Sequence, residues 1–116
     1  MTTPVDKPVY SFTVTASDVT DPPTATCTPD LVTVDISNAL IEFILVTPGF
    51  SFDPEAPITF NESTTDFPDL WAISATQVSV RDRCTTAGDY AFTVHLVQDE
   101  SGQRLKVDPT IRNQPT

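Results

Sequence analysis

Two cysteines and one histidine are the residues of this chain best suited to nucleophilic or metal chemistry. Cys27 and Cys84 are spaced like the cysteines that bridge the sheets of immunoglobulin domains, and a bridge across so long a loop is worth about 4 kcal/mol. Cys27 lies in a segment rich in Thr, Pro and Asp, however, and a cytoplasmic chain keeps its thiols reduced. Arg81 and Arg83 near Cys84 would favour a reactive thiolate. A disulfide, two structural thiols and a regulatory thiol therefore all stay open.

His95 is the only histidine, which limits the chemistry that it can support. A cupredoxin-type copper site needs two histidines beside a cysteine, and a zinc site needs a compact set of ligands. A catalytic triad needs an imidazole that is polarised in a pocket. His95 falls instead on the outward phase of an alternating segment, Tyr90 to Leu96. We expect a solvent-facing histidine, no metal and no catalytic base.

Carboxylates are the remaining reactive groups, with 16 acidic residues against 6 basic ones. Loops that converge at one end of a β-fold can supply the oxygen ligands that calcium needs, but no segment has the spacing of an EF-hand. We expect these carboxylates to be solvated turn residues, with calcium or small-ligand binding through the acidic loops as the alternative. The residues concerned are Asp18, Asp21, Asp30, Asp53, Glu55, Asp66, Asp69, Asp82, Asp99 and Glu100.

The glycines and the net charge exclude further classes of ligand. Gly49, Gly88 and Gly102 are the only three glycines and are isolated from one another, so no Gly-rich phosphate loop exists. The formal charge of −10 repels nucleic acid and anionic membranes, and it favours cations or a basic protein surface. No apolar run is long enough to span a bilayer. Residues 1–6 have no secretory signal pattern, so we expect a cytoplasmic protein, or an extracellular one if a signal was removed.

The segments that position these residues have the two-residue period of β-strands. Thr, Val and Ile make up nearly a third of the chain, and eleven prolines divide it into short segments. The turn before Gly102 predicts a hairpin of residues 89–98 and 103–108. We expect one domain over residues 1–116, an all-β two-sheet antiparallel immunoglobulin-like sandwich of seven or eight strands, with a small β-barrel as the alternative. Alternation is seen at residues 10–16, 32–36, 41–45, 58–60, 71–73, 78–80 and 90–96.

The rest of the chain is expected to be irregular. Residues 17–30 and 48–57 are predicted loops, and helix is limited to a turn or two at residues 66–70. We expect frayed ends at residues 1–7 and 113–116.

Three aromatic residues are candidates for binding. Trp71 is expected to fill the core between the sheets, and the alternative is a surface contact with protein or carbohydrate. Phe50 and Phe52 are in phase with each other, so their apolar edge either seals the sandwich or forms a dimer or partner interface.

Two segments resemble known families. Residues 87–94, with Tyr90 at the start of a strand, resemble the tyrosine-anchored corner of immunoglobulin-like sandwiches. The opening Tyr10-Ser11-Phe12-Thr13-Val14 and the closing Asp108-Pro109-Thr110-Ile111-Arg112-Asn113 resemble small uncharacterised bacterial proteins of the DP-EP type. The latter likeness covers about a fifth of the chain and implies no activity.

These observations predict a protein that is not an enzyme and uses no cofactor. We expect a protein-interaction or structural module that works through its loops or an exposed sheet edge and is able to self-associate.

Overall fold

The computed structural model describes residues 9–19, 23–61 and 65–115, and all regular structure in them is strand. Among these residues there is no helix long and apolar enough to cross a membrane. The strands are β1 (Val9–Ser17), β2 (Thr24–Thr28), β3 (Leu31–Val34), β4 (Ala39–Leu45), β5 (Phe50–Phe52), β6 (Ile58–Phe60), β7 (Asp69–Ser74), β8 (Gln77–Asp82), β9 (Gly88–Gln98), β10 (Arg104–Val107) and β11 (Thr110–Asn113).

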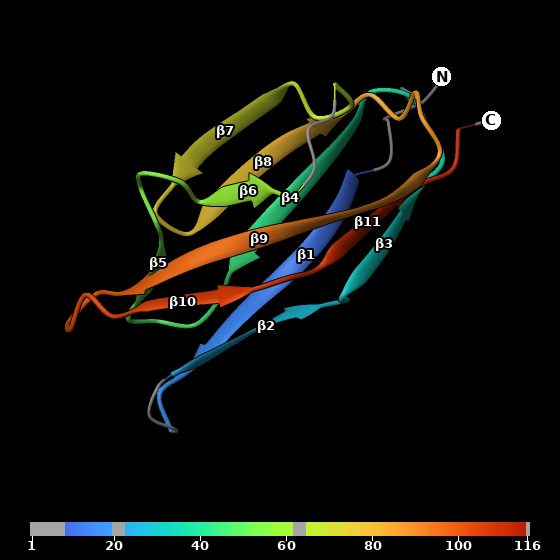
Figure 1. Cartoon of the computed structure of the whole chain (residues 1–116). Helices are drawn as coiled ribbons and strands as arrows, with labels where there is room; N and C mark the ends of the chain where they lie inside the picture. The colour runs from blue at the N-terminus through green and yellow to red at the C-terminus, as the bar shows by residue number, and fades with distance from the viewer. Residues whose placement is uncertain (1–8, 20–22, 62–64, 116) are drawn as a thin grey trace, which may run out of the picture.

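The strands form two sheets that pack face to face as a sandwich (Figure 1). The first sheet has the order β2-β1-β4-β8-β7, and the second contains β10, β9, β11 and β3, with β5 and β6 also paired to β9. The predicted β-sandwich is confirmed, and the sheets do not close into the alternative barrel.

Strand number and direction differ from the prediction. The described residues contain eleven strands instead of seven or eight, because the predicted loops at 17–30 and 48–57 contain β2 and β5, and β11 follows the predicted hairpin. The sheets are mixed rather than antiparallel, since β1 pairs with β4 and β11 with β3 in parallel. The chain leaves the first sheet for β3 between β2 and β4, so β4 returns beside β1 in the same direction.

The predicted hairpin is present as the antiparallel pair β9 and β10. Beyond β10 the chain continues along β9 as β11, because Val107 faces Val94 and Thr110 faces Ala91 in a single register. Asn113, which we expected in a frayed end, is the last residue of β11 and is buried. The helical turn predicted at residues 66–70 is replaced by a bend and the start of β7.

Three phenylalanines join the two sheets at the centre of the core. Phe12 of β1 and Phe43 of β4 stack with ring centroids 5.0 Å apart, and the ring of Phe92 on β9 meets both edge-on, at 5.7 and 5.3 Å. All three are fully buried, as their place in the inward phase of alternating segments predicts. The outer face of β4 is partly open to solvent, since Ile44 is 36% exposed.

The corner before β9 has the geometry that its sequence resembles. The hydroxyl of Tyr90 donates a hydrogen bond to the backbone oxygen of Thr86, four residues earlier, at 3.1 Å. This is the contact by which a tyrosine anchors such a corner in immunoglobulin-like sandwiches.

Candidate interaction edge

Strand β7 is an edge of the first sheet, and its apolar side chains are largely in solvent. It pairs on one side with β8, where Leu70 faces Val80 and Trp71 faces Ser79. The exposed fractions are 39% for Leu70, 45% for Trp71 and 58% for Ile73. No other strand of the described chain has three large apolar side chains exposed in this way. Its second side has no partner strand among residues 9–19, 23–61 and 65–115, so backbone groups on that side are available for pairing.

The interpretation of Trp71 as a core residue is wrong. Residues 70–73 are four successive apolar residues, and a strand turns alternate side chains to opposite faces, so at most half of them can face the core. Trp71 lies in register with Ser79 on the outer face. This apolar run is the sequence signal that indicates the exposed edge. It includes Leu70 and Ile73, which were not among the predicted binding residues.

A bulge interrupts the pairing of β7 with β8 near its end. Ala72 faces Val78 and Ser74 faces Gln77, so Ile73 is the extra residue on β7. A bulge of this kind twists an edge strand and limits the length that another chain can pair with regularly. The regular edge therefore runs from Asp69 to Ala72.

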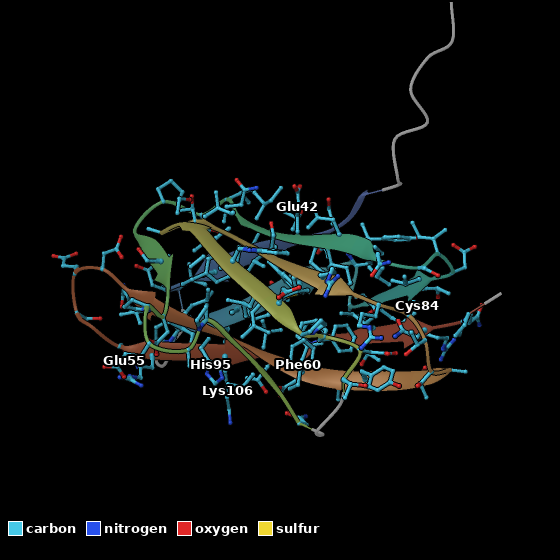
Figure 2. All side chains as sticks on the ribbon, turned by 90° about the horizontal axis from the view of Figure 1, so that it is seen from above. Glu42, Glu55, Phe60, Cys84, His95 and Lys106 are labelled. Atoms are coloured by element: carbon cyan, nitrogen blue, oxygen red, sulfur yellow. The ribbon has the colours of Figure 1, made fainter. Side chains whose placement is uncertain are left out.

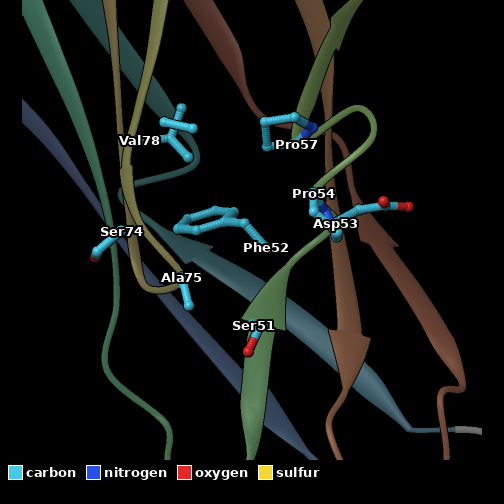
Figure 3. Close-up of a pocket in the computed structure, with 9 residues that line it drawn as sticks. Ser51, Phe52, Asp53, Pro54, Pro57, Ser74, Ala75 and Val78 are labelled. Carbon is cyan, nitrogen blue, oxygen red and sulfur yellow. The ribbon is translucent and has the colours of Figure 1, made fainter.

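An apolar cavity of about 330 Å³ lies beside this edge, between β7 and the segment that links β5 to β6 (Figure 3). Phe52 forms one wall, and Figure 3 shows its ring reaching from β5 toward the strand that carries Val78. The backbone N–H of Phe52 donates to the oxygen of Ala75 at 2.9 Å and so joins the two sheets at one end of the cavity. The side chains that give the cavity its apolar lining are those of Phe52, Pro54, Pro57, Ala72, Ala75 and Val78.

Phe50 and Phe52 seal the sandwich rather than forming an exposed surface. They are 6% and 4% exposed, and β5 pairs with the end of β9, where Phe50 faces Gln98 and Phe52 faces Leu96. Phe52 belongs to the candidate edge only as a wall of the cavity. Of the three aromatic candidates, Trp71 alone presents its side chain to solvent.

The two cysteines are free thiols. Cys27 faces Val14, which faces Leu45 at one end of β4, whereas Cys84 follows Asp82, which faces Ala39 at the other end. The six-residue separation along β4 corresponds to about 20 Å, far beyond disulfide reach. Figure 2 shows Cys84 at one end of the molecule, opposite Glu55.

Neither thiol has the environment of a reactive cysteine. Burial raises the pKa of Cys27 to about 11. Burial also raises the pKa of Cys84, and the nearby Asp82 carboxyl raises it further. Arg81, which we expected to favour a thiolate, forms an ion pair with Asp69 instead. Both cysteines therefore act as small apolar residues of the core.

His95 is half-buried on the outer side of the second sheet, beside Lys106 (Figure 2). Its Nε2 atom lies 2.8 Å from the hydroxyl of Thr59 on β6. A hydroxyl cannot polarise an imidazole as a carboxylate does, so this contact joins two strands and does not make a base.

Several of the acidic residues named above have partners within the protein. Asp53 pairs with Arg104, Asp69 with Arg81, and Asp99 accepts a hydrogen bond from Ser51. No group of three potential metal-binding side chains occurs among residues 9–19, 23–61 and 65–115. Asp21 lies outside the described residues.

Two carboxylates are buried, which we did not predict. Asp66 accepts hydrogen bonds from the backbone N–H groups of Thr85 and Thr86, at 3.2 and 3.0 Å, and from the hydroxyl of Thr85. The side-chain amide of Asn113 donates both to Asp66, at 3.1 Å, and to Asp82, at 2.9 Å. These contacts bind the last strand to the end of β8.

The two buried carboxylates have opposite pKa shifts. Burial raises the pKa of Asp82 to about 6. Burial also acts to raise the pKa of Asp66, but the hydrogen bonds from Thr85, Thr86 and Asn113 outweigh it and lower the pKa. The difference follows from the number of donors that stabilise each ionised form.

Comparison with known proteins identifies no family for this chain, so its function has to be inferred from the fold and from the edge at β7. The chain matches no protein-family model and no curated protein. The resemblance of its first and last strands to proteins of the DP-EP type stays a prediction.

Proposed function

We propose that the protein is a non-enzymatic interaction module that binds an extended segment of a partner protein along β7. The observation that carries this proposal is the exposure of Leu70, Trp71 and Ile73 on one unpaired edge strand. A partner strand added there makes backbone hydrogen bonds with β7, and its alternate side chains reach the apolar cavity beside Ala72. The regular edge admits about four residues of such a segment.

Charge favours a partner segment that carries basic residues. The protein has a formal charge of −10, and Arg81, Arg104 and Arg112 are already paired with carboxylates. Glu55, between the two cavity-lining prolines, is exposed and adds negative charge near the edge. An apolar segment flanked by Lys or Arg is therefore attracted, and its association slows as salt is added.

A second copy of the chain is the less favoured occupant. Edge-to-edge pairing of two β7 strands would bury Trp71 of both copies, but it brings together two bodies of charge −10. Self-association is therefore expected only at high salt and high concentration, where this repulsion is screened.

Three observations support a module without catalysis in a reducing compartment. His95 contacts a hydroxyl, both thiols are buried and unbonded, and the acidic side chains in the turns serve as local acceptors. Buried free thiols suit the cytoplasm, which is the compartment that we propose. Acidic-loop binding of calcium has no comparable observation in its favour.

Synthetic peptides test the partner chemistry directly. A nine-residue peptide of alternating Val and Thr, flanked by lysines and carrying a fluorophore, is titrated with protein at low and physiological salt. We expect binding that weakens with salt, and a shift of the Trp71 fluorescence to shorter wavelength as the indole is covered. Trp71 is the only tryptophan, so the signal reports on this edge alone. The same peptide flanked by glutamates is expected to bind at least tenfold more weakly.

Surface variants locate the binding site. Trp71→Ser with Ile73→Ser is expected to abolish peptide binding while leaving the fold intact, because both side chains are about half exposed. Val46→Ser is the matched control, since Val46 is 54% exposed but does not lie on β7. Equal binding by all three proteins would refute the edge as the site. If the protein forms a dimer at physiological salt and the dimer is lost when Trp71 is replaced, the occupant of the edge is a second copy of the chain and not the proposed partner.

A further inference from the structure

The side chains of Asp82 and Asn113 meet at the end of the sandwich, and each keeps one oxygen without a partner. Asn113 Nδ2 donates to Asp82 Oδ1 at 2.9 Å, so the amide and the carboxyl group lie side by side. Within the described part of the chain, Asp82 Oδ2 and Asn113 Oδ1 are buried and accept no hydrogen bond. Asp82 is 0% exposed and Asn113 is 1% exposed.

Two buried acceptors without hydrogen bonds destabilise the fold, and a single proton placed between them satisfies both. An ionised carboxylate and an amide oxygen can only accept hydrogen bonds, so neither satisfies the other. A protonated carboxyl group also has a donor, and a carboxylic acid beside a primary amide can form two hydrogen bonds in opposite directions. A buried acceptor that is left without a hydrogen bond destabilises the fold.

We propose that in mildly acidic solution Asp82 is protonated in the folded protein, and that its proton joins Asp82 Oδ2 to Asn113 Oδ1. The two side chains then form a two-point acid–amide pair. Asp82 ends β8 in the first sheet, and Asn113 ends β11 in the second, so the proton links the two sheets at this end of the sandwich. It also helps to hold β11 between β9 and β3.

Burial and a neighbouring carboxylate favour the protonated form of Asp82, whereas the hydrogen bonds from Asn113 and Cys84 favour the ionised form, and burial is the largest of these effects. Asp66 supplies the neighbouring carboxylate, whose negative charge opposes a second charge at Asp82. Cys84 donates its backbone N–H to Asp82 Oδ1 at 2.9 Å, while its thiol donates to Val34. Asp35 after β3 is bound by the hydroxyl of Tyr10 on β1. Asp89 of β9 and Arg112 of β11 pair with each other in solvent.

The stability of the fold then depends on pH in a direction opposite to that of most carboxylates. The pKa of Asp82 is about 6 in the folded protein, against about 3.9 in an unfolded chain. Between these values the folded state holds a proton that the unfolded state has lost, so stability falls as pH rises from about 4 to about 6. A difference of about two pKa units corresponds to a roughly hundredfold fall in the folding equilibrium constant.

Asp82→Asn mimics the protonated acid and does not titrate. Urea unfolding of the wild type and Asp82→Asn is compared at half-unit steps from pH 3.5 to 7.5. We expect the two proteins to follow the same pH dependence below about pH 4. The variant should gain on the wild type up to about pH 6, by as much as a hundredfold, and keep that advantage above it. A gap that is constant with pH, or that changes in the opposite direction, refutes the proposal.

Carboxyl-carbon NMR titration of the wild type keeps the test independent of any variant. The Asp82 carbon is expected to titrate near pH 6, whereas Asp89 serves as an internal reference because its hydrogen bond with Arg112 lowers its pKa. A midpoint for Asp82 below pH 4 would show that the folded protein holds the ionised form, and the proposal would fail even if Asp82→Asn does not fold.

Discussion

The carboxylate of Asp66 organises the turn that follows β8. Both of its oxygens accept hydrogen bonds from Thr85 or Thr86, and one of them also accepts from Asn113. The four donors contact both carboxylate oxygens. A neutral side chain of similar size, such as that of Asn, has only one acceptor oxygen, so it cannot accept from all four. Asp66 is thus a structural residue, although its sequence context, between Thr65 and Phe67-Pro68, is typical of a solvated turn.

Replacing Asp66 by Asn is expected to lower the free energy of unfolding by about 2–3 kcal/mol at pH 7, since charge-assisted hydrogen bonds are lost. The pKa of Asp66 is lowered in the fold, so its contribution is present above about pH 4 and is lost as pH falls through the folded pKa. Urea unfolding should therefore show wild type and variant converging below pH 4. Asp18→Asn, at an exposed loop position, is the control and should change little. A gap that persists unchanged at pH 2.5 would contradict this role.

The burial of two carboxylates, Asp66 and Asp82, illustrates how little the local sequence shows about burial. Asp66 and Asp82 lie among residues that favour turns, and we grouped them with the solvated carboxylates, yet both are 0% exposed. Asn113 belongs to neither turn, and it reaches them only because β11 pairs with β3 and β9. Burial of a polar residue depends on neighbours distant in sequence, which local patterns do not contain.

The hairpin of β9 and β10 is the element best specified by its own sequence. Strong alternation from Tyr90 to Leu96 establishes which side chains face the core, and Gly102 allows the turn to have a positive φ of 72°. Register and turn chemistry agree, so the hairpin could be predicted with its ends almost correct.

Gly102→Ala is expected to destabilise the protein by about 1 kcal/mol, because an L-residue is strained at this φ. An added Cβ would meet nothing within 4 Å, so the backbone alone causes the cost. Thermal unfolding measures the effect. Gly102→Asn is the matched control, as Asn tolerates this conformation better and should lose less. Equal stability of the Ala variant and the wild type would show that the turn changes conformation at no cost.

Strand β7, unlike the hairpin, has a place in the fold that its own sequence does not specify. Residues 71–73 form a strand, as predicted, but β7 lies at the edge of its sheet and pairs only with β8 among the described strands. Propensity indicates that a segment is extended, whereas its place in the strand order decides whether an apolar residue such as Trp71 is buried.

The whole molecule is held together across its two sheets by the cluster of Phe12, Phe43 and Phe92. Phe92 is the only one of the three that comes from the second sheet. Its ring meets the other two edge-on, which is a favoured aromatic geometry, and it is fully buried. Removing it therefore affects the contact between the sheets rather than one strand.

Phe92→Ala is expected to lower the free energy of unfolding by about 3–5 kcal/mol, through lost burial and the cavity that remains. Trp71→Ala removes a larger side chain but should cost less than about 1 kcal/mol, because that side chain is already half in solvent. Urea unfolding of both variants provides the comparison. A larger cost for Trp71→Ala than for Phe92→Ala would place the tryptophan in the core and contradict the edge described here.

The all-β class, the inward phase of the main strands and the hairpin of β9 and β10 could be predicted from the residues alone. These follow from side-chain periodicity and turn residues, which act over a few positions. The parallel pairing of β1 with β4, the exposure of Trp71, the separation of Cys27 from Cys84, and the meeting of Asp82 with Asn113 are visible only in the folded molecule. Each of these depends on which strands become neighbours, and that choice is made by burial of the whole core rather than by any local segment.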